Sequence, residues 1–127
     1  MTFRSLLAYL PIAIAIIMSS EVNAGDGFEL LENCQVVVEQ KKGASLNEVG
    51  RLKAAKCLAY LSGFGGADAL SPLSRKGRRM FCIPKEISLS EAAELTVDWM
   101  HKNENKLMYG SHEVLAMANI ANFPCRL

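Results

Sequence analysis

A small all-α domain of four helices, cross-linked by disulfides, is the fold that this sequence predicts. Apolar residues recur at helical spacing in four segments, and no run alternates between apolar and polar residues as a half-buried strand would. Four cysteines follow an amino-terminal export signal, which indicates disulfides. We expect a four-helix bundle-like domain, because helices of this kind bury their apolar stripes against one another.

The first 24 residues read as a removable signal peptide. A basic start, Met1 to Arg4, precedes an apolar run from Leu6 to Met18, and Val22 and Ala24 occupy the small-residue positions of a cleavage site. As a helix the run would span about 20 Å, less than the ~30 Å of a bilayer core. We expect cleavage near Ala24 and an exported mature domain, residues 25–127, that is not embedded in a membrane.

Size and charge exclude several classes of protein. Removing 24 of the 127 residues leaves 103, and the formal charge stays at +1 because the removed segment holds one basic and one acidic residue. A chain of this length buries one modest core, too little for a dinucleotide-binding fold with a substrate domain or for a barrel enzyme. The balanced charge argues against nucleic acid as a partner.

The first predicted helix spans Phe28 to Lys42 and ends at Gly43, a residue that stops helices. Its apolar stripe is Leu30, Leu31, Cys34, Val37 and Val38.

A capping box of Ser45 and Glu48 predicts the start of the second helix, which runs to about Phe64. It is apolar nearly all round from Ala54 onward, so we expect it to be the central and most buried helix. Three glycines in it predict close packing against another helix: Gly63, Gly65 and Gly66. A phosphate-binding loop would need a preceding strand and a following Lys-Ser/Thr pair, and neither is present.

A loop from Ser71 to Met80 leads to the third helix, which Ser88 caps together with Glu91. Its predicted apolar face is Leu89, Ala92, Ala93, Thr96, Val97, Trp99 and Met100. A polar stretch from His101 to Lys106 and a short turn at 107–109 come before the fourth helix. We expect Ser111 to cap that helix, whose apolar side is Val114, Leu115, Met117, Ala118 and Ala121.

The four cysteines allow three pairings, and helix geometry favours one of them. If the first two helices form an antiparallel hairpin that turns near Ala44, Cys34 and Cys57 stand about 15 and 20 Å from the turn. We therefore expect the disulfides Cys34–Cys57 and Cys82–Cys125. A metal site or a redox site would need short spacings such as Cys-x-x-Cys, which the chain lacks.

The candidates for catalysis are few. His101 and His112 are the only histidines, and we expect both to be surface or capping residues. Asp68 stands in an apolar stretch and could be a buried carboxylate, but we expect it rather to cap or hydrogen-bond the loop that follows it. Paired cysteines leave no thiol nucleophile, and no serine lies in a Gly-x-Ser-x-Gly turn. The sequence therefore predicts a binding protein with no metal or cofactor rather than an enzyme.

A basic run is the sharpest charge feature, and it comprises Arg75, Lys76, Arg78 and Arg79. It is either a solvated loop or a contact for an acidic partner, because arginine binds carboxylates through two parallel hydrogen bonds.

Three motifs occur in order behind the signal peptide: Cys57-Leu-Ala-Tyr60-Leu-Ser-Gly63-Phe-Gly-Gly-Ala-Asp68-Ala-Leu, then Phe81-Cys82-Ile83-Pro84, then Phe123-Pro124-Cys125. Together they resemble the Rap/Tai family of periplasmic immunity proteins of type VI secretion systems, over about Glu29 to Cys125. The resemblance implies a disulfide-bonded helical domain that binds and occludes a toxic effector, typically a peptidoglycan-cleaving amidase. Where the family usually has a proline in the turn after the third helix, this chain has Asn103 to Asn105.

Two segments are candidates for contact with the effector. One is the basic run, and the other is the turn between the third and fourth helices, with His101, Asn103, Glu104, Tyr109 and His112. An exposed apolar stripe on an outer helix would also support a homodimer. The alternative function is that of a small acid-stress chaperone, which exposes apolar surface when its carboxylates are protonated.

Overall fold

The structure is a computed structural model that describes residues 25–73 and 78–126. It contains four helices, α1 (Gly27–Lys41), α2 (Glu48–Leu70), α3 (Leu89–Lys102) and α4 (Ser111–Asn122), and two short 3-10 turns at Ser71–Leu73 and Glu104–Lys106. No strand occurs among the described residues, so the predicted all-α class is confirmed. Among these helices none is long and apolar enough to cross a membrane.

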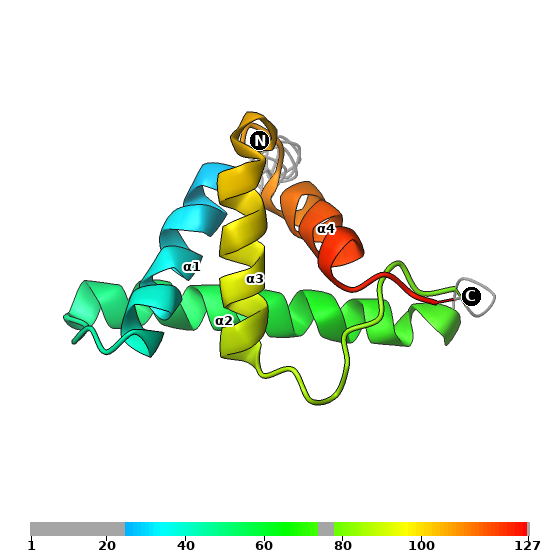
Figure 1. The fold of residues 1–127 in the computed structure, drawn as a ribbon, viewed down its shortest axis with the longest axis horizontal. Helices are drawn as coiled ribbons and strands as arrows, with labels where there is room; N and C mark the ends of the chain where they lie inside the picture. The colour runs from blue at the N-terminus through cyan, green and yellow to red at the C-terminus, as the bar shows by residue number, and fades with distance from the viewer. Residues whose placement is uncertain (1–24, 74–77, 127) are drawn as a thin grey trace, which may run out of the picture.

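The longest helix, α2, lies against α1 and α3. Figure 1 shows α2 along the long axis of the molecule and α1 and α3 running across it, while α1, α3 and α4 converge at residues 103–110. The amino end of α1, the carboxyl end of α3 and the amino end of α4 meet there. We call residues 103–110 the apex turn.

The local signals for the ends of helices are confirmed in two cases. Gly43 adopts a φ of +100° just past the end of α1, a conformation that glycine reaches without a steric penalty. Ser88 and Glu91 form the predicted capping box, with the N–H of Ser88 donating to Glu91 Oε2 at 2.8 Å.

The predicted caps of α2 and α4 are wrong. Asn47, not Ser45, caps α2, and its side-chain oxygen accepts a hydrogen bond from the N–H of Gly50 at 2.8 Å. Asparagine is as good an N-cap as serine, and Asn47 directly precedes the continuous helix. Gly110 is the cap residue of α4, and Ser111 is already its first helical residue.

The predicted apolar stripes of the first, third and fourth helices form the core, with two exceptions. Leu89 and Ala121 are exposed because they lie in the first and last turns of their helices, beyond the reach of neighbouring elements. The largest fully buried side chains are Phe81, Met100, Leu107, Leu115 and Val114.

The prediction that α2 is the central helix is wrong. The helices α1 and α3 each contact all of the others, whereas α2 buries only Ala54, Cys57, Leu61 and Asp68. Much of the apolar character of α2 comes from alanine and glycine, and apart from Ala54 the alanines of this helix are exposed, as are Gly63 and Gly66.

The glycines of α2 do not mediate close packing, contrary to the prediction. A Cβ added at Gly63 or Gly66 would meet nothing within 4 Å, and one at Gly65 would lie 3.7 Å from Ile83. Close approach occurs instead at Gly27, where a Cβ would lie 2.8 Å from backbone atoms of Leu107.

Both predicted disulfides are confirmed. Cys34–Cys57 joins α1 to α2, and Cys82–Cys125 joins the segment before α3 to the segment after α4. The antiparallel hairpin behind the first pairing is wrong, because Figure 1 shows α1 crossing α2. The cysteines still meet, since helices that cross touch near their middles and each cysteine lies near the middle of its helix.

Candidate functional site

The apex turn is held from inside by two residues. Asn103 Nδ2 donates to the backbone oxygen of Trp99 at 2.8 Å and so satisfies a free carbonyl at the end of α3. Leu107 is fully buried and anchors the middle of the turn in the core. The turn therefore has a fixed conformation although no disulfide joins it.

An amino-terminal strap, residues 25–27, pairs with residues 109–111 in the same region. The strap and the end of the apex turn are antiparallel, with Asp26 bridged to Gly110. Two backbone hydrogen bonds flank the bridge, one from the N–H of Ser111 to the oxygen of Gly25 at 2.8 Å and one from the N–H of Gly27 to the oxygen of Tyr109 at 2.9 Å. The strap can approach this closely because Gly27 has no side chain.

This pairing brings the backbone next to Phe28 close to that of Tyr109, and three large apolar side chains are exposed on the two segments. Phe28 is 56% exposed, Met108 73% and Tyr109 43%. We call these three residues the apex group. The ammonium of Lys106 lies 5.7 Å from the centre of the Tyr109 ring and adds a cation–π contact. Exposed aromatic and methionine side chains with a charge at the rim are typical of protein-binding surfaces.

Phe28 was missed by the sequence analysis, which treated it only as the start of the first helix. The available signal was its position: it is an aromatic residue outside the apolar stripe of α1. Only the pairing of the strap with residues 109–111 brings it to the apex turn.

The structure brings the five predicted residues of this region to the same end of the molecule. His101, Glu104, Tyr109 and His112 are exposed, and Asn103 is directed to the carbonyl of Trp99. His101 Nε2 lies 3.0 Å from Gln35 Oε1, so this ring links α3 to α1. Three of the four exposed residues thus have side chains without a hydrogen bond among the described residues, and they are Glu104, Tyr109 and His112.

Of the basic run, the structure describes only Arg78 and Arg79, which lie in the segment that follows α2, away from the apex turn (Figure 1). Arg75 and Lys76 fall outside the described residues. Arg78 is exposed, and its backbone oxygen accepts a hydrogen bond from Ser71 Oγ at 3.0 Å. Arg78 and Arg79 are therefore not part of the apex turn, and they belong to a separate surface.

Arg79 forms an ion pair within the protein. Its Nε lies 3.4 Å from Oδ2 of Asp68, a carboxylate that is 3% exposed. The other oxygen of Asp68 accepts a hydrogen bond from the N–H of Met80 at 2.9 Å. The expectation that Asp68 bonds the following loop is confirmed, and Arg79 is the cation that accompanies this buried carboxylate.

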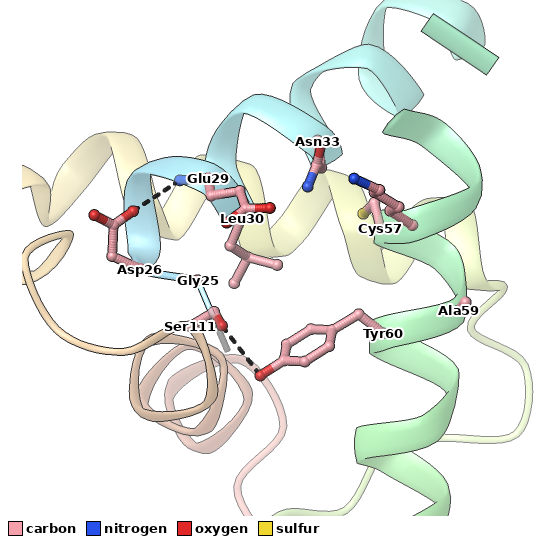
Figure 2. Close-up of a pocket in the computed structure, with 10 residues that line it drawn as sticks. Gly25, Asp26, Glu29, Leu30, Asn33, Cys57, Ala59, Tyr60 and Ser111 are labelled. Carbon is pink, nitrogen blue, oxygen red and sulfur yellow. Dashed lines mark hydrogen bonds between the residues drawn. The ribbon is translucent and has the colours of Figure 1, made fainter. Parts of the chain in front are cut away.

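A pocket of about 410 Å³ lies beneath the strap, between α1, α2 and the start of α4. Figure 2 shows Leu30 and the Tyr60 ring facing its interior, and the Tyr60 hydroxyl is 3.3 Å from the hydroxyl of Ser111. The remaining lining residues are Gly25, Asp26, Glu29, Asn33, Lys56, Cys57 and Ala59.

The described residues offer little for bond-making chemistry. All four cysteines are in disulfides, and no group of His, Cys, Asp and Glu within 25–73 and 78–126 could hold a metal ion. What the arrangement does provide is a fixed turn that presents apolar side chains to a partner.

The family model of the Rap1a immunity proteins matches residues 26–125. No curated protein and no solved structure matches the chain significantly.

Proposed function

The chain belongs to the Rap1a immunity proteins, and from this membership we propose that it binds and occludes a peptidoglycan amidase delivered into the periplasm by a type VI secretion system. An immunity protein protects the cell that makes it against a secreted effector. Two disulfides support a location outside the reducing cytoplasm, and the apolar run at 6–18 supports export through a cleaved signal peptide.

The exposed apex group is the observation that carries the mode of binding. Phe28, Met108 and Tyr109 offer apolar area, and Lys106, Glu104 and His112 offer polar contacts beside it. A cleft that accommodates a glycan-linked peptide is concave, so a protruding turn is the shape that fills it. Because Asn103 and Leu107 already fix the turn, binding loses little side-chain and backbone entropy to ordering.

The test measures binding to the purified secreted protein encoded beside this chain. Truncating Tyr109 or Met108 to alanine is expected to weaken the complex at least tenfold, or about 1.4 kcal/mol. Ile120→Ala is the matched control, because Ile120 is apolar and 46% exposed, close to the 43% of Tyr109, but lies near the carboxyl end of α4. The wild-type protein should also inhibit cleavage of peptidoglycan stoichiometrically. Unchanged affinity in both apex variants would place the contact elsewhere.

The basic run is the second candidate contact. Arg78→Glu tests it without disturbing the fold, since the Arg78 side chain is exposed and only its backbone oxygen is bonded. Arg79 is unsuitable for that test because reversal of its charge would leave Asp68 buried beside another carboxylate. We expect Arg78→Glu to slow association with an acidic effector and to leave the helical circular dichroism spectrum unchanged.

A homodimer is the remaining part of the proposal. The outer side of α2 carries exposed apolar side chains, Val49, Leu52 and Leu70 among them, as an interface between copies would require. Sedimentation of the mature protein at micromolar concentration should give twice the monomer mass. A monomer mass across that range would contradict this part of the proposal and leave the effector contact untouched.

A further inference from the structure

The carboxylate of Glu29 is held at the start of the strap without a partner. A Cβ added to Gly25 would lie 1.9 Å from Glu29 Oε2, so this oxygen rests against the α-carbon of Gly25. Within residues 25–73 and 78–126 the Glu29 side chain has no hydrogen bond or ion pair; only its backbone N–H is bonded, to Asp26. Figure 2 shows Asp26 and Glu29 at the same side of the pocket as Gly25.

Gly25 is also the residue that the proposed export step turns into a chain end. Hydrolysis of the bond between residues 24 and 25 leaves a carboxylate on the released peptide and an amine on Gly25. Water supplies the oxygen of that carboxylate and the protons of the products, and at neutral pH the amine is protonated. An ammonium group then forms next to the unpaired carboxylate.

We propose that the ammonium group of Gly25, created by removal of residues 1–24, is bound by Glu29 and that this ion pair fastens the strap against the apex turn. The inference rests on the proposed export. Its structural basis is the backbone pairing of 25–27 with 109–111, which begins at Gly25 itself. The backbone pairing starts at the first residue of the mature chain, and chain ends tend to fray. The ion pair between Gly25 and Glu29 would hold this end of the strap in place.

Lys56 is the cation that also lines this pocket, and it opposes binding of a second positive charge. Two features offset it: Lys56 is exposed to water, which screens its charge, and Asp26 adds a second carboxylate adjacent to Gly25. The N-cap bond of Asp26 uses only one of its oxygens.

A double-mutant cycle on oxidised mature protein tests the pair. Four chains are compared by thermal unfolding: one beginning at Gly25, one retaining residues 23 and 24, and the Glu29→Gln variant of each. The two extra residues move the ammonium by about 7 Å along an extended chain. Substitution of Glu29 also removes its favourable interaction with the α1 dipole, but this loss is common to both lengths and cancels in the cycle.

We expect Glu29→Gln to lower the midpoint by about 2–5 °C more in the chain that begins at Gly25 than in the longer chain. Glu48→Gln is the control, because Glu48 occupies the first turn of α2. Its effect should be the same at both lengths. An equal effect of Glu29→Gln at both lengths would overturn the ion pair.

The pH dependence gives a second measurement with a defined sign. An ion pair raises the pKa of the α-amino group above its value of about 7.7–8.0 in the unfolded chain. The stabilisation is therefore complete below that value and is lost as pH rises through the folded pKa. The extra effect of Glu29→Gln should shrink between pH 7 and 9. Asp26, Lys56, Tyr60, His112 and Glu113 also lie around this site, and all four chains contain them.

Sequencing of the amino terminus of the exported protein completes the test. A start at any residue other than Gly25 would overturn the inference. Failure to bind an amidase would overturn the proposed function alone, since the thermal cycle requires no effector.

Discussion

The apex turn lies between α3 and α4, and residues 78–84, which we call the corner, lie between α2 and α3. The two segments are stabilised by different means. The apex turn depends on backbone pairing with the strap and on one buried leucine, Leu107. The corner depends on a disulfide, Cys82–Cys125, and on the buried Asp68 with Arg79 beside it. The difference shows that backbone pairing and a buried leucine position the segment with exposed apolar side chains, while a disulfide and an ion pair position Arg79 and Cys82.

This contrast separates the roles of exposed residues at the two ends. At the apex, Phe28, Met108 and Tyr109 are exposed and are free to contact a partner. At the corner, part of the positive charge serves the fold, because Arg79 accompanies Asp68. Changes at Asp68 and Arg79 should therefore act mainly on stability, and changes at the apex mainly on binding.

The largest effect is expected from the disulfide of the corner. Replacing Cys82 and Cys125 together by serine removes a link that closes 43 residues and should lower the free energy of unfolding by about 4 kcal/mol. The pair Cys34 and Cys57, which closes 23 residues, should cost about 3 kcal/mol. Urea unfolding at fixed pH measures both. A larger loss for the shorter loop would contradict this ordering.

Removal of the buried carboxylate of the corner comes next. Asp68→Ala leaves the N–H of Met80 without its acceptor and Arg79 without its partner, so we expect a loss of about 2 kcal/mol in urea unfolding. Asp98→Ala is the control, since Asp98 is exposed on α3. If both variants unfold at the same urea concentration, the Asp68 contacts do not stabilise the corner.

Alanine substitutions at two glycines, one in each region, should change the stability of the protein in opposite directions. Gly27→Ala places a Cβ 2.8 Å from Leu107 and Val114 and should destabilise the apex by about 1–2 kcal/mol. Gly63→Ala, on the open side of α2, should stabilise the protein by about 0.5–1 kcal/mol through its better helix propensity. Thermal unfolding distinguishes the signs, and destabilisation by Gly63→Ala would mean that this side of α2 is covered.

The smallest effect is expected from acidification. The hydrogen bonds from the backbone and side chain of Ser88 lower the pKa of Glu91 below its ordinary 4.5. A lowered folded pKa contributes stability that is present above the unfolded value and is lost as pH falls through the folded one. Glu91→Gln should therefore flatten the loss of thermal stability below pH 4.5. An identical acid profile for the variant and wild type would exclude this contribution.

Dye binding at acidic pH also distinguishes the proposed function from that of an acid-stress chaperone. An immunity protein of this fold should not gain binding of a hydrophobic dye at mildly acidic pH while it remains helical. A strong gain with retained helicity would favour the chaperone.

Much of the helical framework was predictable because its signals are local. The stripe of Leu30, Cys34, Val37 and Val38 has the period of a helix, and Ser88 with Glu91 forms a cap within one turn. The pairing of the cysteines was also predicted correctly, although from a hairpin that does not exist. The pairing survived because both cysteines lie near the middles of their helices, which is where crossing helices also meet.

The candidate site was predictable only in part. The histidines, Glu104 and Tyr109 were correctly assigned to one region because they are close in sequence. Phe28 could not be assigned with them, since about eighty residues separate it from Tyr109 and the strap pairing has no sequence signature. The role of Arg79 was equally hidden, because its partner Asp68 looks like any carboxylate at the end of a helix.

The class of fold, the ends of two helices, the disulfide partners and the family could all be inferred from the amino-acid sequence. Which helix lies outside, which glycine packs closely and which end of the molecule presents apolar side chains became apparent only in the folded structure. The two groups of features differ in how far apart along the chain the interacting residues are. Helical periods and caps depend on neighbours within one or two turns, whereas the exposure of α2, the contact of Gly27 with Leu107 and the position of Phe28 depend on how distant segments pack.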